Sequence, residues 1–596
     1  MLKISTSTVY SVGKFDKWAI KKLLTAKESI AYTQRSGKMK KTLVSILLII
    51  VLAFGGYSGY KIWRNNSQEV GITEVYQLLV VSGKTIDQTP LSTDAYEKLS
   101  TKKYISESML KTLGFLVSHD EEENCTSLVS YDTLMRYDMD KGTLTYDGVE
   151  RPFKNSPFII NGELYFDKAN FEDGLNVGWY INDQRKILMA LDNMNDYSKV
   201  SVVEGSGVYK VVNDVNGDRL QTLEVHSNLF IGDIADGWAE IVTEQLVHGY
   251  VQVTSLSESK LYQTILHPKK SFDYRKEPIN LTWEAVYSKN PNVAKIPEMT
   301  GLNVISPTWM SLANEEGRIN KKLISSTYTE WAHARGYEVW PLISNDFKPE
   351  RTSKFLHSAK ARQAFIDELL SLSLTNNFDG INIDFENVFL EDKDALSQFV
   401  AELSQTLRQH DLTVSMDVTV IGGSDNWSRC YDRASLGQYV DYLMIMAYDQ
   451  YWASSPTSGP VAAYDWVSTK MNEIIKVVPA HKVVLGMPTY MRIWREVPST
   501  EKANVMKAKS ETLSMNRLIR MMDEKDFNFI WDETGQHYYI GYIEDNILTK
   551  IWIENGKSIR AKTAYARENE LAGVATWRRG FETQDIWGII EEELNK

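Results

Sequence analysis

The segment Asp379–Glu386 constrains the fold of this chain more than any other. Its sequence, Asp-Gly-Ile-Asn-Ile-Asp-Phe-Glu, alternates apolar and polar side chains with the period of a β-strand. The apolar side chains would pack against covering helices. The polar ones, which end in Asp384 and Glu386, would face the opposite side. Because burying unpaired carboxylates is costly, we expect an inner face where these acids are hydrogen-bonded to each other or to a ligand.

Residues 278–596 alternate apolar strands with helical stretches, which is the rhythm of a (β/α)8 barrel. The eight predicted strands are Leu281–Tyr287, Leu302–Pro307, Glu338–Ile343, Gly380–Phe385, Thr413–Val418, Tyr442–Ala447, Lys482–Gly486 and Gly573–Trp577. In such a barrel the last inward residue of a strand opens onto the catalytic face, and in the fourth strand that residue is Glu386. The long interval before the eighth strand has strands of its own and predicts a small α+β insertion at about residues 490–570; these strands are Phe527–Trp531, Tyr538–Tyr542 and Ile547–Trp552.

The run 379–386 closely resembles the signature strand of glycoside hydrolase family 18, the chitinase-like enzymes, whose usual form is DGxDxDxE. One position departs, because Asn382 stands where the family has its second Asp. Four more strand ends resemble the family pattern in the correct order. They are Ser415–Asp417 on the fifth strand, Met444–Asp449 on the sixth, Gly486–Arg492 on the seventh and Gly573–Trp577 on the eighth. The resemblance covers about half of the chain.

The two best acids are neighbours at i and i+2 on one strand, so they approach a sugar from one side. This arrangement does not supply an opposed nucleophile and suits the substrate-assisted retaining mechanism, in which the 2-acetamido oxygen of the substrate attacks the anomeric carbon. The resemblance then implies that Glu386 is the acid/base, that Asp384 holds the acetamido N–H and that Tyr448 binds its carbonyl oxygen. We also expect the clustering of Asp379 with Asp384 and Glu386 to raise at least one carboxyl pKa. The other candidate substrate-binding residues are Asp379, Asn382, Asp417, Met446, Asp449, Tyr490, Arg492 and Trp577.

Within the family, the chain most resembles the spore-cortex-lytic and related peptidoglycan-acting bacterial branch. The resembling parts are the Asn-Ile-Asp-Phe-Glu run, the turn at Tyr448–Gln450 with the later Gly459–Val461, and the tail from Trp552 to Trp577. The expected substrate is therefore an N-acetylglucosamine polymer, peptidoglycan first and chitin second. The alternative is a lectin-like carbohydrate-binding protein, because the family includes inactive members that usually lack the Glu present here as Glu386.

No Cys/His cluster in the sequence has zinc spacing and no Gly-rich phosphate loop occurs, so neither a metal nor a nucleotide cofactor is implied. Cys125 and Cys430 fall in different predicted domains, and we expect them to be unpaired. The sequence does not indicate an oligomeric state.

The N-terminal end is basic and the rest of the chain is acidic. Residues 1–41 carry ten Lys/Arg and two acids, which leaves a net charge of −20 on residues 42–596 and argues against nucleic acid as a partner. Residues 42–60 are uncharged and barely long enough to span a bilayer. We expect a single-pass signal anchor with the barrel outside the cell. A cleaved signal peptide, which would give a secreted or wall-bound protein, is the alternative.

Two modules are predicted between this segment and the barrel. Residues 72–195 read as a small α+β wall-associated module with a hairpin at Ser156–Phe166, which loosely resembles the N-terminal domain of copper amine oxidases without a His set for copper. Residues 199–256 read as a small all-β barrel, and Gly237–Ile241 with Gly249–Val251 resemble bacterial Src-homology-3-like domains. Binding of peptide stems and a spacer role both remain open for this module.

Overall fold

The computed structural model describes residues 76–82, 85–101, 103–130, 133–171, 177–182, 187–192, 197–203, 206–209, 219–257, 260–262, 277–498 and 506–596. The predicted basic segment 1–41 and the predicted membrane segment 42–60 lie outside these residues. In the part of the chain that is described, no helix is both long and apolar enough to cross a membrane. By their mutual contacts, residues Tyr76–Lys596 belong to one unit.

The C-terminal part is a closed barrel of eight parallel strands, as the sequence predicts. The sheet runs in the order β20-β34-β28-β27-β26-β25-β24-β21 and closes through the pairing of β20 with β21. The strands are β20 (Ile279–Glu284), β21 (Val304–Leu312), β24 (Leu342–Ser344), β25 (Gly380–Asp384), β26 (Thr413–Thr419), β27 (Tyr442–Met446), β28 (Val483–Pro488) and β34 (Gly573–Trp577). The short β22 (Ile319–Asn320) and β23 (Glu338–Val339) both pair with β21.

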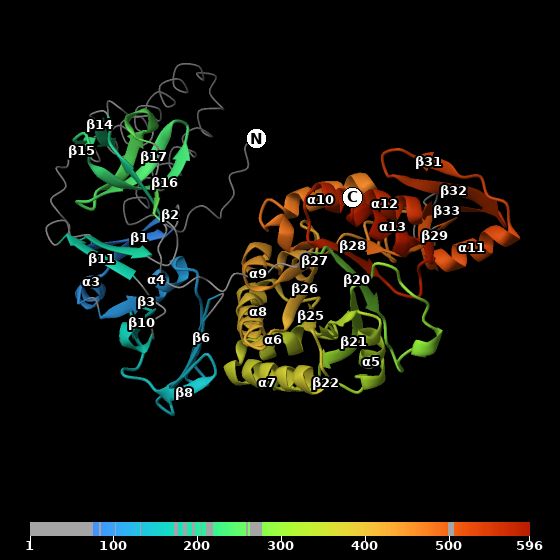
Figure 1. Cartoon of the computed structure of the whole chain (residues 1–596), viewed down its shortest axis with the longest axis horizontal. Coiled ribbons are helices and arrows are strands. Elements are labelled where there is room, and N and C mark those ends of the chain that lie inside the picture. Colours follow the sequence, from blue (N-terminus) through green and yellow to red (C-terminus); the bar gives the residue numbers. More distant parts are fainter. Residues whose placement is uncertain are drawn as a thin grey trace, which may run out of the picture. The chain divides into compact units, whose positions relative to one another are not determined.

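Helices cover the outside of the barrel, and Figure 1 shows α6 to α9 flanking strands β25 and β26. They are α5 (Ser326–Ala334), α6 (Pro349–His357), α7 (Ala359–Thr375), α8 (Lys393–Arg408), α9 (Arg433–Tyr439), α10 (Tyr464–Ile474), α12 (Gly556–Glu568) and α13 (Asp585–Leu594). Pro349 begins α6, where its missing N–H leaves no hydrogen bond unmade, and the Ser358 hydroxyl caps α7. The βα alternation therefore brings the carboxyl ends of all eight strands to one face of the barrel.

The alternation in β25 divides its side chains between two apolar layers. Phe385, which follows the strand, packs outward among three buried rings, those of Phe355, Phe365 and Phe399, at centroid distances of 5.5–6.3 Å. The inside of the barrel is filled by a separate cluster that includes Trp283 and Trp340. The predicted orientation of the strand is confirmed.

The predicted insertion is an antiparallel five-stranded sheet with one helix. Its strands are β29 (Tyr490–Pro498), β30 (Met506–Ser514), β31 (Ile530–Asp532), β32 (His537–Glu544) and β33 (Ile547–Ile553), in the order β30-β29-β33-β32-β31, and its helix is α11 (Met515–Glu524). Because β29 begins two residues after β28 ends, the insertion rises directly from the carboxyl end of a barrel strand.

Three small sheets precede residue 195. The first contains β1 (Tyr76–Ser82), β2 (Thr85–Leu91), β11 (Val177–Asn182) and β12 (Ile187–Asp192); the second contains β3 (Tyr104–Ser106), β9 (Phe158–Ile160) and β10 (Glu163–Asp167); the third contains β4 (Leu116–Asp120), β5 (Cys125–Val129), β6 (Leu134–Asp138), β7 (Thr143–Tyr146) and β8 (Val149–Pro152). Helices α3 (Thr93–Ser100) and α4 (Glu107–Thr112) complete the α+β module. The predicted hairpin is present as β9–β10, and its turn residues Asn161 and Gly162 have φ of 52° and 84°, as a tight Asn-Gly turn requires.

The β4–β8 sheet contacts the outer helices of the barrel through charged groups. Arg362 on α7 donates to Glu402 on α8 at 3.1 Å and 3.2 Å, and both side chains are almost completely buried. Arg136 on β6 lies 3.6 Å from the same carboxylate, and the charges of Arg362 and Arg136 hold the pKa of Glu402 below its usual value against the effect of burial. The start of α7 is also capped from this sheet, because Ala359 N–H donates to Asp120.

A seven-stranded antiparallel sheet follows, as the prediction of a small all-β module expects. Its strands are β13 (Tyr197–Ser201), β14 (Ser206–Tyr209), β15 (Arg219–Leu223), β16 (Asn228–Ala235), β17 (Trp238–Thr243), β18 (His248–Gln252) and β19 (Lys260–Tyr262). Its likeness to Src-homology-3 domains stays a prediction.

Candidate active site

Strand β25 places three polar side chains in a row on the inner face of the barrel. Asn382 is completely buried and accepts a hydrogen bond from Trp283 Nε1 at 3.0 Å. Asp384 follows at the end of the strand, and Glu386 lies just beyond it. The side-chain amide of Asn382 is thus held by the indole of Trp283 on β20.

Asp384 is half-buried, and its Oδ1 atom is buried without a hydrogen-bond partner. Burial raises the pKa of this carboxyl to about 7. The group can therefore exist in either protonation state near neutral pH, and its Oδ1 atom has hydrogen-bonding capacity that the protein does not use.

Glu386 is a strong candidate for a general acid. Its pKa is raised well above the usual value, first by burial and then by the negative charges of Asp384 and Asp449. A carboxyl that stays protonated at neutral pH can donate a proton to a leaving oxygen.

The backbone of Glu386 is held by Asn345, which follows β24. Asn345 Nδ2 donates to the Glu386 carbonyl oxygen at 2.7 Å, and Glu386 N–H donates back to Asn345 Oδ1 at 3.1 Å. Asn345 is completely buried and also donates to Thr352 Oγ1 at 3.0 Å. This pair of hydrogen bonds holds the backbone of Glu386 in a fixed position relative to β24.

Asp417 lies on the neighbouring strand β26, where Ile383 pairs with Met416, so its carboxyl is level with Asp384. It is 2% exposed and its Oδ1 atom is also buried without a partner. Burial and then the charges of Asp384 and Glu386 raise its pKa well above the usual value. The three carboxyls therefore form one electrostatic cluster.

Tyr448 follows β27 and faces this cluster. Burial raises its pKa well above the usual value, and the charges of Asp417, Tyr490, Glu386 and Asp384 add to the effect. The hydroxyl is thus a neutral hydrogen-bond donor over the working pH range.

Asp449 is engaged by two residues of β29. Its Oδ1 atom accepts from the Tyr490 hydroxyl at 2.7 Å and from Arg492 Nη2 at 2.6 Å. Arg492 is 6% exposed and also donates to the Tyr451 carbonyl at 3.3 Å. The insertion therefore contributes directly to the rim of the site, next to Tyr448, whose ring lies edge-on to that of Tyr490 at 6.4 Å.

The two remaining candidates on this face lie at neighbouring strand ends. Trp577 ends β34, is half-buried and makes an edge-to-face contact with Trp283 at 6.0 Å. Met446 ends β27 and is half-buried.

The expected clustering of Asp379 with Asp384 and Glu386 is wrong. Asp379 precedes β25, at the amino end of the strand, whereas the other two acids lie at its carboxyl end. Its Oδ2 atom accepts from Val339 N–H and pairs with His333 Nε2, both at 2.8 Å. Asp379 therefore ties strands and a helix together on the opposite face of the barrel.

Sequence reasoning missed three residues of the site. Trp283 was within a predicted strand, and the alternation of that strand could have placed it inward. Asn345 follows a predicted strand end but carries no motif. Tyr431, whose hydroxyl donates to the Phe385 carbonyl at 2.9 Å, lies in the loop after β26 and gave no local signal.

The described residues contain no group of three or more His, Cys, Asp and Glu side chains that could hold a metal ion. Cys125 and Cys430 are both free thiols, and burial raises the pKa of Cys430 to about 11. The chemistry that the site itself offers is proton transfer and hydrogen bonding by carboxyl, phenol and amide groups.

Several known proteins are similar to this chain. The chain is similar to the uncharacterized glycosylase YvbX of Bacillus subtilis, with 27% identity over 286 residues, covering 44% of this chain and 76% of the relative. It is 23% identical to the cortical fragment-lytic enzyme of the same organism over 258 residues, covering 43% of this chain and 58% of that enzyme. The crystal structure of the Bacillus megaterium spore cortex-lytic enzyme SleL aligns with a TM-score of 0.48 and 17% identity, covering 62% of this chain and 89% of that one. Residues 308–582 match the profile of the glycosyl hydrolases family 18, and the barrel therefore contains a domain of that family.

Proposed function

We propose that this chain hydrolyses a glycan containing N-acetylglucosamine by a substrate-assisted retaining mechanism. One observation carries the proposal: Asp384 ends β25, Glu386 lies two residues further along at the same end of the barrel, and both have raised pKa values. Glu386 is the acid/base that protonates the leaving oxygen and then deprotonates the attacking water.

The acetamido group of the substrate is the nucleophile in this proposal. The Asp384 carboxylate accepts its N–H, and the Tyr448 hydroxyl donates to its carbonyl oxygen. The other acids near Glu386 are poorly suited to attack the sugar, because Asp449 is held by Tyr490 and Arg492 and burial favours the protonated form of Asp417. An intramolecular nucleophile on the sugar fills that role.

The proposed substrate class is a polymer, with peptidoglycan ahead of chitin. Four large aromatic side chains are exposed in loops that follow barrel strands, where sugar rings can stack on them: Tyr287, Phe347, Trp427 and Trp452. The similarity to a cortical fragment-lytic enzyme supports a bacterial wall glycan.

A wall substrate requires that the barrel lies outside the membrane. Residues 1–41 are basic and residues 42–60 are uncharged, which supports an N-terminal signal anchor with its basic side in the cytoplasm. The small module at residues 199–256 would then hold the enzyme near the wall.

The test of the catalytic role uses Glu386→Gln, which keeps the shape of the side chain and removes the proton. Turnover of purified peptidoglycan or chitin oligomers, read by mass spectrometry, should fall about 10²–10⁴-fold with substrate binding retained. Asp379→Asn, at the other end of the same strand, is the matched control and should keep its turnover. Near-normal activity of Glu386→Gln would refute the assignment.

A second test addresses the nucleophile. De-N-acetylated polymers should not be cut, and a thiazoline mimic of the cyclised intermediate should inhibit, because both depend on the acetamido group. Cleavage of the de-N-acetylated polymer at a comparable rate would show that the protein supplies the nucleophile.

A further inference from the structure

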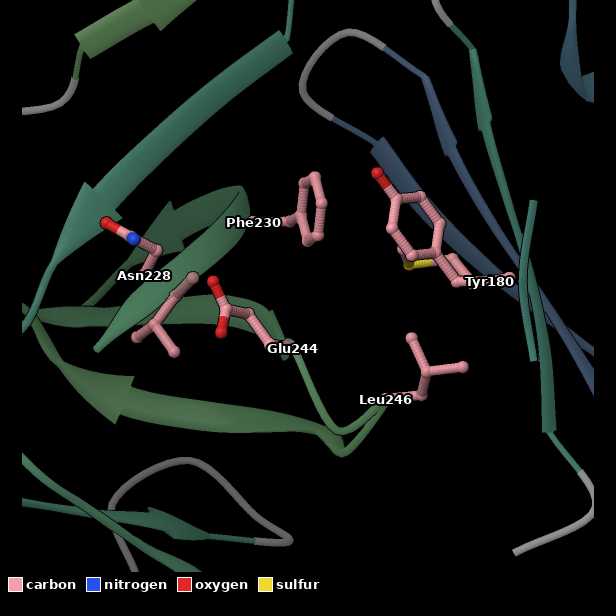
Figure 2. A pocket seen from close by; sticks show the side chains of 7 residues that line it. Tyr180, Asn228, Phe230, Glu244 and Leu246 are labelled. Atoms are coloured by element: carbon pink, nitrogen blue, oxygen red, sulfur yellow. The ribbon is translucent and has the colours of Figure 1, made fainter. Parts of the chain in front are cut away.

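A cavity of about 270 Å³ lies away from the barrel, between the β11–β12 hairpin and the seven-stranded sheet (Figure 2). Tyr180 and Met189 line it from the hairpin. The sheet contributes an amide, three apolar side chains and one carboxylate, which are Asn228, Leu229, Phe230, Leu246 and Glu244. Figure 2 shows Tyr180 facing Phe230 across the cavity, with Glu244 on the Phe230 side. The cavity therefore combines aromatic and apolar groups with one amide and one acid.

Three residues that line the cavity also belong to a packed apolar cluster. Leu79, Met189, Phe230, Val242 and Leu246 form a buried apolar cluster that joins the two sheets. At the edge of the contact, Asn182 Nδ2 donates to the Gln245 carbonyl oxygen at 2.9 Å. The shape of the cavity thus exists before any ligand enters, which lowers the entropic cost of binding.

The turn that carries the acid is strained and firmly anchored. Leu246 has a φ of 60°, which is uncommon for a non-glycine residue. Leu246 N–H donates to the Thr243 carbonyl at 2.9 Å, and the Thr243 hydroxyl accepts from Val247 N–H at 3.1 Å. Here the strained conformation directs Leu246 into the apolar cluster and leaves Glu244 at the cavity.

Glu244 is exposed, and among the described residues it makes no hydrogen bond or ion pair. The Tyr180 and Phe230 rings make an edge-to-face contact at 6.1 Å and 65°, and Tyr180 is exposed whereas Phe230 is buried, so a ligand in the cavity meets the Tyr180 ring. An aromatic face attracts a cation, and a carboxylate pairs with it. Together the Tyr180 ring and the Glu244 carboxylate match a positively charged ammonium group.

We propose that this cavity binds an aliphatic primary ammonium, such as the side chain of a lysine-like residue in a peptide. The charge of the surrounding module favours a cation, since residues 199–256 contain eight Asp/Glu and three Lys/Arg. The site is independent of the barrel, and it gives the N-terminal region a ligand of its own.

The test uses the full chain and saturation-transfer difference NMR, which detects weak ligands of a large protein. The probe is Nα-acetyl-lysine methylamide, and its Nε-acetylated form is the neutral counterpart. Saturation should be transferred to the side-chain methylenes of the amine. The affinity should be at least about tenfold weaker for the neutral probe, and likewise for the amine with the variant Glu244→Gln, because each change removes one charged hydrogen bond. Tyr180→Leu, which keeps an apolar wall without the ring, should weaken binding several-fold.

Glu224→Gln is the matched control, because Glu224 is an exposed acid of the same module that does not line the cavity, and it should leave the affinity unchanged. Equal binding of the amine and of its acetylated form would overturn the ammonium assignment. Absence of saturation transfer, or an affinity unaffected by Glu244→Gln and Tyr180→Leu, would overturn the site.

Discussion

Asn345→Ala tests whether the placement of the acid depends on a side chain that does not touch the substrate. The Asn345 side chain makes two hydrogen bonds with the backbone of Glu386. It donates to the carbonyl oxygen at 2.7 Å and accepts from the N–H at 3.1 Å. Alanine removes both and leaves the two backbone groups of Glu386 without these partners at a buried position. The residue after β25 then loses its link to β24.

Alanine also removes the hydrogen bonds of Asn345 to Thr352 and from Phe347 N–H, so four lost hydrogen bonds of about 1 kcal/mol each predict a loss of about 4 kcal/mol in the free energy of unfolding. Catalysis should suffer separately, because displacement of a reacting group by about 1 Å costs about 10²-fold in rate. We therefore expect kcat to fall about 10–100-fold while KM changes little, since the groups that bind the sugar remain in place.

The assay combines urea unfolding with steady-state kinetics on a soluble N-acetylglucosamine oligomer. Asn303→Ala is the matched control, because Asn303 accepts from Asn280 N–H at 2.9 Å and donates to the Pro278 carbonyl at 2.8 Å. It makes the same pair of backbone hydrogen bonds at the amino end of the barrel and should lose about half as much stability without losing kcat. If both variants lose stability and both keep their kcat, the positioning role of Asn345 is refuted.

Three further predictions follow from other parts of the molecule. Burial raises the pKa of Asp384 from 3.8 to about 7, so the folded state binds this proton more tightly than the unfolded state, and the resulting stability is complete below about pH 4 and lost as the pH rises to about 7. Asp384→Asn should therefore have a higher melting temperature than the wild type at pH 7.5 but not at pH 4. A difference in melting temperature that is the same at both pH values would contradict this. Glu402→Ala should lower the free energy of unfolding by about 3–5 kcal/mol at unchanged kcat, because Arg362 would stay buried without its partner, whereas Glu315→Ala, at an exposed pair, should cost less than about 1 kcal/mol. Protease added to intact, wall-stripped cells should digest the barrel, and a protected barrel in the cytoplasm would exclude the proposed wall substrate.

The strands and the acids of the site could be predicted because their signals are local. A run such as Gly380–Phe385 shows its two faces by alternation alone, and all eight predicted barrel strands are present. The order of the strand ends then brings Asp384, Asp417 and Tyr448 to one face, as parallel strands require.

The residues that could not be predicted act across distance in the sequence. Asn345 binds the backbone of a residue 41 positions away, and Trp283 binds Asn382 over 99 positions. Neither lies in a motif, since a single Asn or Trp is compatible with many environments. Asp379 shows the opposite error, because closeness along a strand does not mean closeness in space: the strand separates its two ends by its whole length.

The contact between the β4–β8 sheet and the barrel limits how far the chain can be truncated from its N-terminal side. A chain that begins at residue 278 keeps every barrel strand, but it loses the Asp120 cap on α7 and the Arg136 charge beside Glu402. It also uncovers Ala401 and Tyr439, which pack against Val129 and Leu134 in a shared apolar cluster. The stable folding unit is therefore longer than the barrel that carries the active site. Substitutions in residues 116–147 should change the melting temperature of the barrel although these residues contribute no atom to the site.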